Sequence, residues 1–246
     1  MTARGAPVAV LVHGARHAAW CWDDAIAWLG ARGHRTIAPT LRGHDADRGE
    51  LDRVTLDDLA ADVRARIEAI EAPVVLVGHS LGGAVAQKVA LGLSRGALVL
   101  VSSVPPTGVL PEDDAHLAER VPDALARIEA FLVRRDPALF PRALFLSDRA
   151  SAEAVDLVRA RLGPASRRLG AELRIPIVDR PAPIPVHVIA GEDDAFLPPA
   201  AHERTRAFHR APPVRTLPGG HDLMLDRAAP ELFGLIEATL ATLENP

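Results

Sequence analysis

The sequence predicts an α/β protein with a doubly wound, mostly parallel sheet and a helical cap inserted before the penultimate strand. Short, almost continuously apolar runs alternate with segments of helical periodicity, which is the pattern of parallel strands joined by helices. The alternation breaks between the fourth and fifth runs, where the chain is helical and bounded by prolines. Because proline continues neither a helix nor a central strand, these prolines mark the limits of an insertion.

The apolar runs are expected to form the strands. In chain order they are Val8–Val12, Arg35–Ala38, Val74–Val77, Ala97–Val101, Val186–Ala190 and Val214–Leu217. Because the runs are almost continuously apolar, we expect strands that are buried on both faces. Parallel strands need crossover connections, and these are right-handed in nearly all proteins. The runs therefore predict a doubly wound sheet.

The segments between the runs carry helix signals. Thr55 and Asp58 form an N-terminal capping pair, in which each side chain bonds the other residue's amide. The apolar residues that follow are spaced along one helix face, and they are Leu59, Val63, Ile67 and Ile70. Further helices are expected at Leu81–Ser94, Pro199–His209 and Pro230–Leu243.

The insertion runs from Pro105 to Arg180 and contains no convincing strand pattern. We expect residues 1–104 and 181–246 to form the core and residues 105–180 to form a helical cap. Open α/β sheets bind their ligands at the carboxyl ends of the strands. The cap is therefore expected to cover that edge of the sheet.

Composition limits the classes of function. The chain has 246 residues, of which 48% are hydrophobic and 24% charged, the balance of a globular protein and not of a disordered one. Its single cysteine, Cys21, excludes an internal disulfide and a CxxC metal site. The net charge of −4 argues against nucleic acid as a partner, because phosphate binding normally needs a basic surface.

No segment is expected to enter a membrane. Every apolar run falls short of the roughly 18–20 residues needed to cross a bilayer. The N-terminal apolar stretch is interrupted by His13, Gly14 and Arg16 and lacks the small-residue cleavage site of a secretory signal. A cytoplasmic location with no membrane partner is therefore the expectation, and a homodimer is left open.

The segment Gly78-His79-Ser80-Leu81-Gly82 carries the strongest chemical signal. It lies where an apolar strand turns directly into a helix, the setting that a G-x-S-x-G nucleophile elbow requires. Glycines on either side of the serine allow the tight turn, and the helix N-terminus favours developing negative charge. We expect Ser80 to be a nucleophile, with an inert serine in a glycine-rich loop as the alternative.

A serine hydroxyl needs a base to take its proton. Among the ten histidines, His221 follows the last apolar run, in a loop that returns to the edge where Ser80 is expected, and an exposed loop histidine is the alternative. His79 is expected to pack beside the nucleophile, and His13 to act as a structural donor under its loop. No partner pattern surrounds the others, which are His17, His34, His44, His116, His187, His202 and His209; most are expected on the surface or satisfied in the core.

The base needs a carboxylate that fixes its tautomer and stabilises the imidazolium. Three acids follow the fifth run, Glu192, Asp193 and Asp194, and at least one should be exposed because packed like charges raise each other's pKa. The spacing G-x-x-D-x-x-x-P favours Asp194 over Asp193. The chain order Ser80, Asp194, His221 is then a nucleophile, acid and base in the order that this strand–turn–helix architecture uses.

A tetrahedral oxyanion needs two backbone donors. The amide of Leu81, directly after the nucleophile, is expected to be the first. The second should come from the loop after the first strand, His13-Gly14-Ala15-Arg16, with Ala15 as the donor. This assignment rests on position alone, because a backbone donor leaves little trace in a sequence.

Over nearly its whole length the chain resembles the α/β-hydrolase superfamily. The matching segments are HG at His13-Gly14, GHSLGG at Gly78–Gly83, GEDDAFLP at Gly191–Pro198 and GGHDLML at Gly219–Leu225. The opening VLVHGARHAAWCW, at Val10–Trp22, is similar to that of the plant methylesterase and hydroxynitrile lyase branch and its bacterial esterase relatives. This narrower resemblance implies a small helical cap and a modest, largely apolar ester pocket.

Departures from the resemblance concern the pocket. Hydroxynitrile lyases carry a lysine after the catalytic histidine, where Asp222 stands here, so cyanohydrin cleavage is not expected. Arg16 stands where many relatives have a small or apolar residue; a pocket arginine could bind a substrate carboxylate, and a solvent-facing arginine is the alternative. Further candidate substrate contacts, with core packing as their alternative, are Trp20, Phe131, Phe140 and Phe145.

These observations lead to the hypothesis of a cofactor-independent serine hydrolase that cleaves a small to medium carboxylic ester through an acyl-enzyme. Two alternatives stay open. The same triad could serve lactone opening, C–C bond hydrolysis or a cofactor-free elimination, or the chain could be a ligand-binding receptor on a hydrolase scaffold. No metal is expected, because the cluster of His44, Asp45 and Asp47 resembles the family's ordinary solvated loop.

Overall fold

The computed structural model of the protein describes residues 5–45 and 48–244. At its centre is a six-stranded sheet with the order β2-β1-β3-β4-β5-β6, in which every pairing is parallel. The strands are β1 (Val8–Val12), β2 (Arg35–Ile37), β3 (Val74–His79), β4 (Ala97–Val101), β5 (Val186–Gly191) and β6 (Arg215–Leu217). The predicted doubly wound parallel sheet is confirmed.

The sheet changes direction of growth at its centre. The chain starts at β1, adds β2 on one side and then places β3 on the other, so that Val8 of β1 pairs with both Arg35 and Val74. The chain therefore leaves the carboxyl ends of the adjacent strands β1 and β3 toward opposite edges of the sheet. In open α/β sheets such a switch point is where ligands bind.

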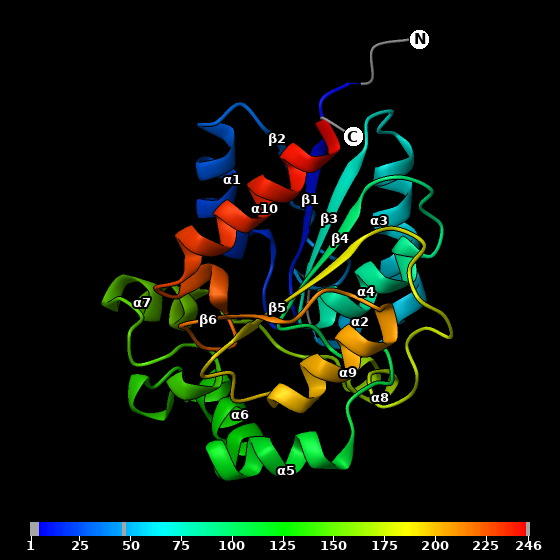
Figure 1. The fold of residues 1–246 in the computed structure, drawn as a ribbon. Helices are drawn as coiled ribbons and strands as arrows, with labels where there is room; N and C mark the ends of the chain where they lie inside the picture. Colours follow the sequence, from blue (N-terminus) through cyan, green and yellow to red (C-terminus); the bar gives the residue numbers. More distant parts are fainter. Residues whose placement is uncertain (1–4, 46–47, 245–246) are drawn as a thin grey trace.

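Helices cover both faces of the sheet (Figure 1). On one face lie α1 (Asp23–Gly30) and α10 (Ala229–Glu244), and on the other lie α3 (Leu56–Glu68), α4 (Leu81–Ala90) and α9 (Pro199–His209). The short α2 (Arg48–Leu51) belongs to the connection between β2 and α3. In the described part of the chain, no helix combines the length and the apolar character that crossing a membrane requires.

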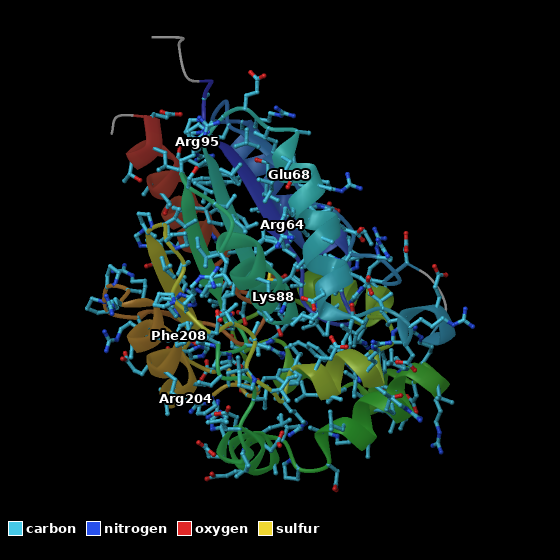
Figure 2. The ribbon with its side chains drawn as sticks, turned by 90° about the vertical axis from the view of Figure 1, so that its right-hand side faces the viewer. Arg64, Glu68, Lys88, Arg95, Arg204 and Phe208 are labelled. Carbon is cyan, nitrogen blue, oxygen red and sulfur yellow. The ribbon has the colours of Figure 1, made fainter. Side chains whose placement is uncertain are left out.

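Strand periodicity divides the apolar residues between two cores. Along β1, Ala9 and Leu11 join the core under α1 and α10, whereas Val8, Val10 and Val12 join the core under α3 and α4, because successive side chains point to opposite faces. On α3, buried apolar residues and exposed polar residues lie on opposite faces of the helix. Its apolar stripe faces the sheet, while Arg64 and Glu68 lie on the exposed side that Figure 2 presents.

The expectation that every strand is buried on both faces is wrong for two of them. All residues of β1, β3 and β4 are buried. In contrast, Arg35 of β2 and both Arg215 and Thr216 of β6 are exposed. These two strands form the edges of the sheet, where fewer neighbours cover the chain, and charged side chains there also discourage edge-to-edge pairing.

Local signals placed the helices to within a few residues. Thr55 and Asp58 form the expected capping box, with Asp58 N–H donating to Thr55 Oγ1 at 3.0 Å and Thr55 N–H to Asp58 Oδ2 at 2.9 Å. The bounds Pro199–His209 are confirmed, but α4 ends at Ala90 and not at Ser94. Gly92 lies just beyond its end, and glycine costs a helix about 1 kcal/mol relative to alanine.

The segment between β4 and β5 is helical, as expected, and contains no strand. Its helices are α5 (Pro111–Arg120), α6 (Ala124–Arg134), α7 (Ala152–Arg161) and α8 (Arg167–Glu172). They lie beyond the carboxyl ends of the strands (Figure 1). Arg204 of α9, labelled in Figure 2, donates to the buried Asp113 of α5 at 2.6 Å, which ties the segment to the core. That residues 105–180 act as a separate cap domain stays a prediction.

Candidate active site

Ser80 occupies the turn between β3 and α4 in a strained backbone conformation. Its φ is 52° and its ψ is −118°, a backbone region that residues other than glycine rarely adopt. The turn is closed by Gly78, where an added Cβ would lie 2.7 Å from Gly83 Cα and 2.7 Å from Ala86 Cβ. The glycines of the motif therefore allow the helix to start directly against the strand, with the serine at the bend.

His221 and Asp194 form an aligned, buried pair. His221 Nδ1 lies 2.9 Å from Asp194 Oδ1 and 3.0 Å from Oδ2, and both side chains are almost fully buried. A carboxylate only accepts, so Nδ1 carries the proton and donates it. The other ring nitrogen, Nε2, is then an acceptor, which is the tautomer that a general base for a serine requires.

The surroundings of this pair favour its ionised form. Burial by itself lowers the pKa of His221, but the charge of Asp194 and its hydrogen bond outweigh burial and raise the pKa above the ordinary histidine value. Burial by itself raises the pKa of Asp194, yet His221 and His202 hold it well below its usual range. The amides of Phe196 and Leu197 also donate to Asp194 Oδ1, at 2.9 and 3.1 Å, which keeps the carboxylate charged.

The neighbouring acids have a different environment. Asp193 is about two-fifths exposed and lies 3.9 Å from Arg120, and Glu192 is more than half exposed beside Arg149. The carboxylate that contacts His221 is thus Asp194, the one that the spacing favours. Exposure of Glu192 also agrees with the expectation that three adjacent carboxylates do not all pack together.

The loop of His221 is attached to the elbow. His79, the residue before Ser80, donates from Nε2 to the His221 carbonyl at 3.1 Å, and the two imidazole rings lie 4.8 Å apart. Burial, reinforced by His221, lowers the pKa of His79 to about 3, so His79 is neutral near pH 7. Its expected place, packed beside Ser80, is confirmed.

The loop after β1 packs directly on the elbow. An added Cβ at Gly14 would lie 3.0 Å from Ser80 Cβ and 2.7 Å from His79 Nδ1, so only glycine fits there. His13 supports this loop, donating from Nδ1 to the Gly14 carbonyl at 2.8 Å and accepting the Leu41 amide on Nε2 at 2.9 Å. The oxyanion roles of Ala15, in this loop, and Leu81, the first residue of α4, stay predictions.

Two histidines that sequence analysis left without partners contact buried carboxylates. His17 Nε2 lies 3.0 Å from Asp222 Oδ2, and His202 Nε2 lies 3.6 Å from Asp194 Oδ2. His116 of α5 also reaches this region, donating to the Asp194 carbonyl at 3.0 Å. No spacing rule could have found these pairs, because each joins side chains from separate loops or helices.

Arg16 is held by the inserted segment. Its guanidinium donates to Glu129 of α6 at 2.9 Å, and its side chain is only 11% exposed. The Gly163 amide, after α7, donates to the Arg16 carbonyl at 2.8 Å. The solvent-facing alternative for Arg16 is therefore wrong. Whether its guanidinium also contacts a substrate stays a prediction.

Aromatic side chains connect the inserted segment to the histidine. Phe131, Phe140 and Phe145 are buried and contact one another in series, with ring centroids 5.1 and 6.0 Å apart. Phe145 lies 5.9 Å from Phe196, whose ring is 4.7 Å from that of His221. These phenylalanines belong to one buried cluster with residues of the core, and their role as substrate contacts, like that of Trp20, stays a prediction. Phe196 is an aromatic neighbour of His221 that sequence analysis did not name. Trp20 is stacked on His17 at 5.1 Å.

Part of this region has the composition of a metal site. The nearest ligand atoms of His79, His221 and Asp222 lie within 4.8 Å of one another. Hydrogen bonds already use one nitrogen of each ring, His79 Nε2 and His221 Nδ1. Sequence analysis also considered a cluster of His44, Asp45 and Asp47. The His44 ring packs against that of His13, and Asp47 lies outside the described residues.

Comparison with known proteins agrees with the geometry. The sequence model of the alpha/beta hydrolase family matches residues 9–233. A carbendazim hydrolyzing esterase from Nocardioides sp. is 42% identical over 119 residues, 47% of this chain and 48% of that protein. Methylesterase 3 of Arabidopsis thaliana is 42% identical over 78 residues, 30% of each chain. The matched stretches thus span about half or less of these curated relatives.

Solved structures of the same fold match nearly the whole chain. The crystal structure of polyneuridine aldehyde esterase has a TM-score of 0.70 at 19% identity, covering 96% of this chain and 99% of that one. The resemblance to the plant methylesterase branch and to bacterial esterases is confirmed by these relatives. Because the family model matches residues 9–233, most of the sequence, the chain belongs to the alpha/beta hydrolase family.

Proposed function

We propose that this protein is a cofactor-independent serine hydrolase that cleaves a small to medium carboxylic ester through an acyl-enzyme. The observation that carries the proposal is the buried, aligned pair of His221 and Asp194, in a loop hydrogen-bonded to the residue before Ser80. Acyl transfer needs a nucleophile and a base. Ser80, strained at a strand-to-helix turn, supplies the first, and His221, whose Nε2 is unprotonated, supplies the second.

In the first half of the reaction, His221 Nε2 takes the proton of Ser80 as Oγ attacks the ester carbonyl carbon. The amides of Leu81 and Ala15 donate to the oxyanion of the tetrahedral intermediate. As that intermediate collapses, the bond to the alcohol oxygen breaks. His221 returns its proton to this oxygen, and the alcohol leaves an acyl group on Ser80.

In the second half, a water molecule replaces the alcohol. His221 takes one of its protons, the hydroxide oxygen attacks the acyl carbon, and the same amides hold the second oxyanion. Collapse breaks the bond to Ser80 Oγ, which regains its proton from His221. Asp194 stays ionised throughout and stabilises the imidazolium that forms twice per cycle.

Aromatic and apolar side chains support an uncharged ester as the substrate class. Phe196 lies against His221, Phe145 lies against Phe196 and His17, and Trp20 stacks on His17. Such surroundings favour an apolar acyl or alcohol group. Several relatives, among them the carbendazim hydrolyzing esterase, are named as esterases.

The test is hydrolysis of a panel of aryl and methyl esters of increasing acyl length by the wild-type protein and by Ser80→Ala. We expect turnover of short to medium acyl groups and a loss of at least about 10³-fold in kcat in the variant. Ser166→Ala is the matched control, because Ser166 is a buried serine that caps α8. Near-wild-type turnover by Ser80→Ala would remove Ser80 from the mechanism.

A further inference from the structure

A second histidine–carboxylate pair, His17 with Asp222, is buried beside the proposed triad. Their side chains are 2% and 0% exposed, and His17 Nε2 lies 3.0 Å from Asp222 Oδ2. His79 Nε2 lies 3.5 Å from the other oxygen of Asp222. The mechanism above assigns neither residue a step, although Asp222 directly follows the proposed base.

Hydrogen bonding fixes the proton count of this pair. His17 Nδ1 lies 2.9 Å from the Ala15 carbonyl, and a carbonyl only accepts, so Nδ1 carries a proton. A neutral His17 would then turn a bare Nε2 toward a carboxylate oxygen 3.0 Å away. The pair therefore holds one further proton, either on Nε2 or on the carboxyl group.

The contact with His17 matters because few other groups offset the burial of the Asp222 carboxylate. Within the described residues, neither Asp222 oxygen has an aligned hydrogen-bond partner. Burial by itself raises the pKa of Asp222, but the neighbouring histidines, His17 first, hold it below its ordinary value. A buried carboxylate without such a partner is costly.

The pair also connects two loops that the reaction must hold together. His17 reaches the carbonyl of Ala15, whose own amide is a proposed oxyanion donor. Asp222 belongs to the loop of His221, and its amide donates to the Phe145 carbonyl at 2.8 Å. The His17–Asp222 contact thus joins the loop after β1, which carries Ala15, to the loop after β6, which carries His221.

We propose that His17 and Asp222 are positioning residues for ester cleavage, holding the Ala15 amide in register with Ser80 and His221. The inference rests on the proposed function. A buried ion pair is a poor stabiliser compared with apolar residues of similar size, so a merely structural role would not favour its presence here. Its contribution is geometric and acts on the transition state.

A geometric role predicts which kinetic constant changes. The oxyanion forms only after attack, so a displaced Ala15 amide weakens transition-state binding and leaves ester binding nearly unchanged. Displacements of about 1 Å cost up to about 10²-fold in rate. Loss of the pair should therefore lower kcat and not raise KM.

The variants are His17→Phe, Asp222→Leu and Asp222→Asn. Phenylalanine keeps a ring but loses both nitrogens, and leucine keeps the volume of Asp222 without a polar atom. Asparagine is the conservative rescue. Its amide N–H can donate to the bare Nε2 of a neutral His17, which keeps Nδ1–H on the Ala15 carbonyl.

We expect His17→Phe and Asp222→Leu each to lower kcat by about 10²-fold with little change in KM. The double variant should lose no more than the worse single variant, because both break one connection. Asp222→Asn should keep kcat within severalfold of wild type. Wild-type kcat in His17→Phe, or a kcat as low in Asp222→Asn as in Asp222→Leu, would overturn the inference.

Two controls separate the possible failures. His209→Phe removes a buried histidine elsewhere, which bridges Gln87 and the Ala182 amide at 3.1 and 3.2 Å, and should leave kcat unchanged even where the thermal midpoint falls. Wild-type protein must turn over an ester and take up one fluorophosphonate on Ser80. If it does neither, the proposed function fails; if it does both and the variants match wild type, only the positioning role fails.

Discussion

The two buried histidine–carboxylate pairs differ in what their second nitrogen does. In His221, Nδ1 donates to Asp194 and Nε2 is left to accept a proton. In His17, Nδ1 donates to the Ala15 carbonyl, and Nε2 faces Asp222 Oδ2 at 3.0 Å without an aligned hydrogen bond. A histidine with one nitrogen bonded to a loop carbonyl and the other facing a buried carboxylate can hold that loop, but neither nitrogen is left for a substrate proton.

The carboxylates differ in the same sense. Asp194 accepts two backbone amides as well as the imidazole, whereas Asp222 lacks an aligned partner within the described residues. Asp194 is held in a fixed direction and can orient the proposed base, whereas Asp222 compensates His17 and through it acts on the Ala15 loop. Substitutions in the two pairs should therefore have effects of different size and kind.

The largest expected effect is that of His221→Ala. Removing the proposed base should lower kcat by about 10⁶-fold, because a missing triad histidine costs about as much as the whole triad. This loss is far greater than the one expected for His17→Phe. The measurement is kcat on the best ester of the panel for both variants, and comparable losses would erase the distinction between the pairs.

Asp194→Asn should come next, with a loss of about 10⁴-fold in kcat, because an amide supports the wrong imidazole tautomer. Asp193→Asn is the matched control at the adjacent position, where the carboxylate is partly exposed, and it should retain wild-type activity. Steady-state rates of the two variants on one ester decide the assignment. Loss of activity in Asp193→Asn alone would move the acid to Asp193.

The pH dependence offers a smaller but sharper test. Burial lowers the pKa of His221, but Asp194 raises it further, so the net pKa exceeds the ordinary histidine value of 6.5. His221 must be neutral to take the serine proton, so kcat/KM should fall as the pH drops through this raised pKa. The acid limb, measured with an uncharged ester, should therefore lie above pH 6.5. An acid limb well below pH 6.5 would show that burial, and not Asp194, determines the direction of the His221 pKa shift.

The smallest expected effect concerns His79, which lies between the pairs. Burial lowers the pKa of His79 from 6.5 to about 3, so the folded protein leaves it neutral where the unfolded chain protonates it. Stability should therefore be lost as the pH falls from about 6.5 toward 3, by on the order of a few kcal/mol. Urea unfolding at pH 7.5 and pH 5 measures the part of this loss that falls above pH 5.

His79→Gln is the variant for that measurement, because glutamine keeps an N–H donor for the His221 carbonyl without titrating. Its stability should change less between the two pH values than that of wild type. An equal change in both proteins would assign the acid sensitivity to other groups, among them His13, whose pKa burial also lowers.

Sequence patterns predicted the parts of this molecule that depend on local rules. The elbow at Ser80 follows from glycine spacing at a strand–helix junction, and the capping box at Thr55 from a single tetrapeptide pattern. Asp194 was separated from Asp193 by spacing alone, and the contact with His221 agrees. Each of these features is encoded within a few residues.

Contacts between distant loops could not be predicted in the same way. His17 and Asp222 lie in loops after β1 and β6, and Glu129 meets Arg16 from the inserted segment. Such pairs depend on where whole elements pack, which no short pattern records. Exposure of β2 and β6 likewise follows from strand order, since a strand's composition does not say whether it lies at an edge.

Covalent labelling examines the nucleophile directly. Wild-type protein and His221→Ala are treated with a fluorophosphonate, and intact mass and peptide mapping locate the adduct. If Ser80 is activated by His221, wild type gains one phosphonyl group on Ser80, and His221→Ala reacts far more slowly. An adduct on another residue, or equal labelling of Ser80 in both proteins, would contradict an activated serine at this elbow.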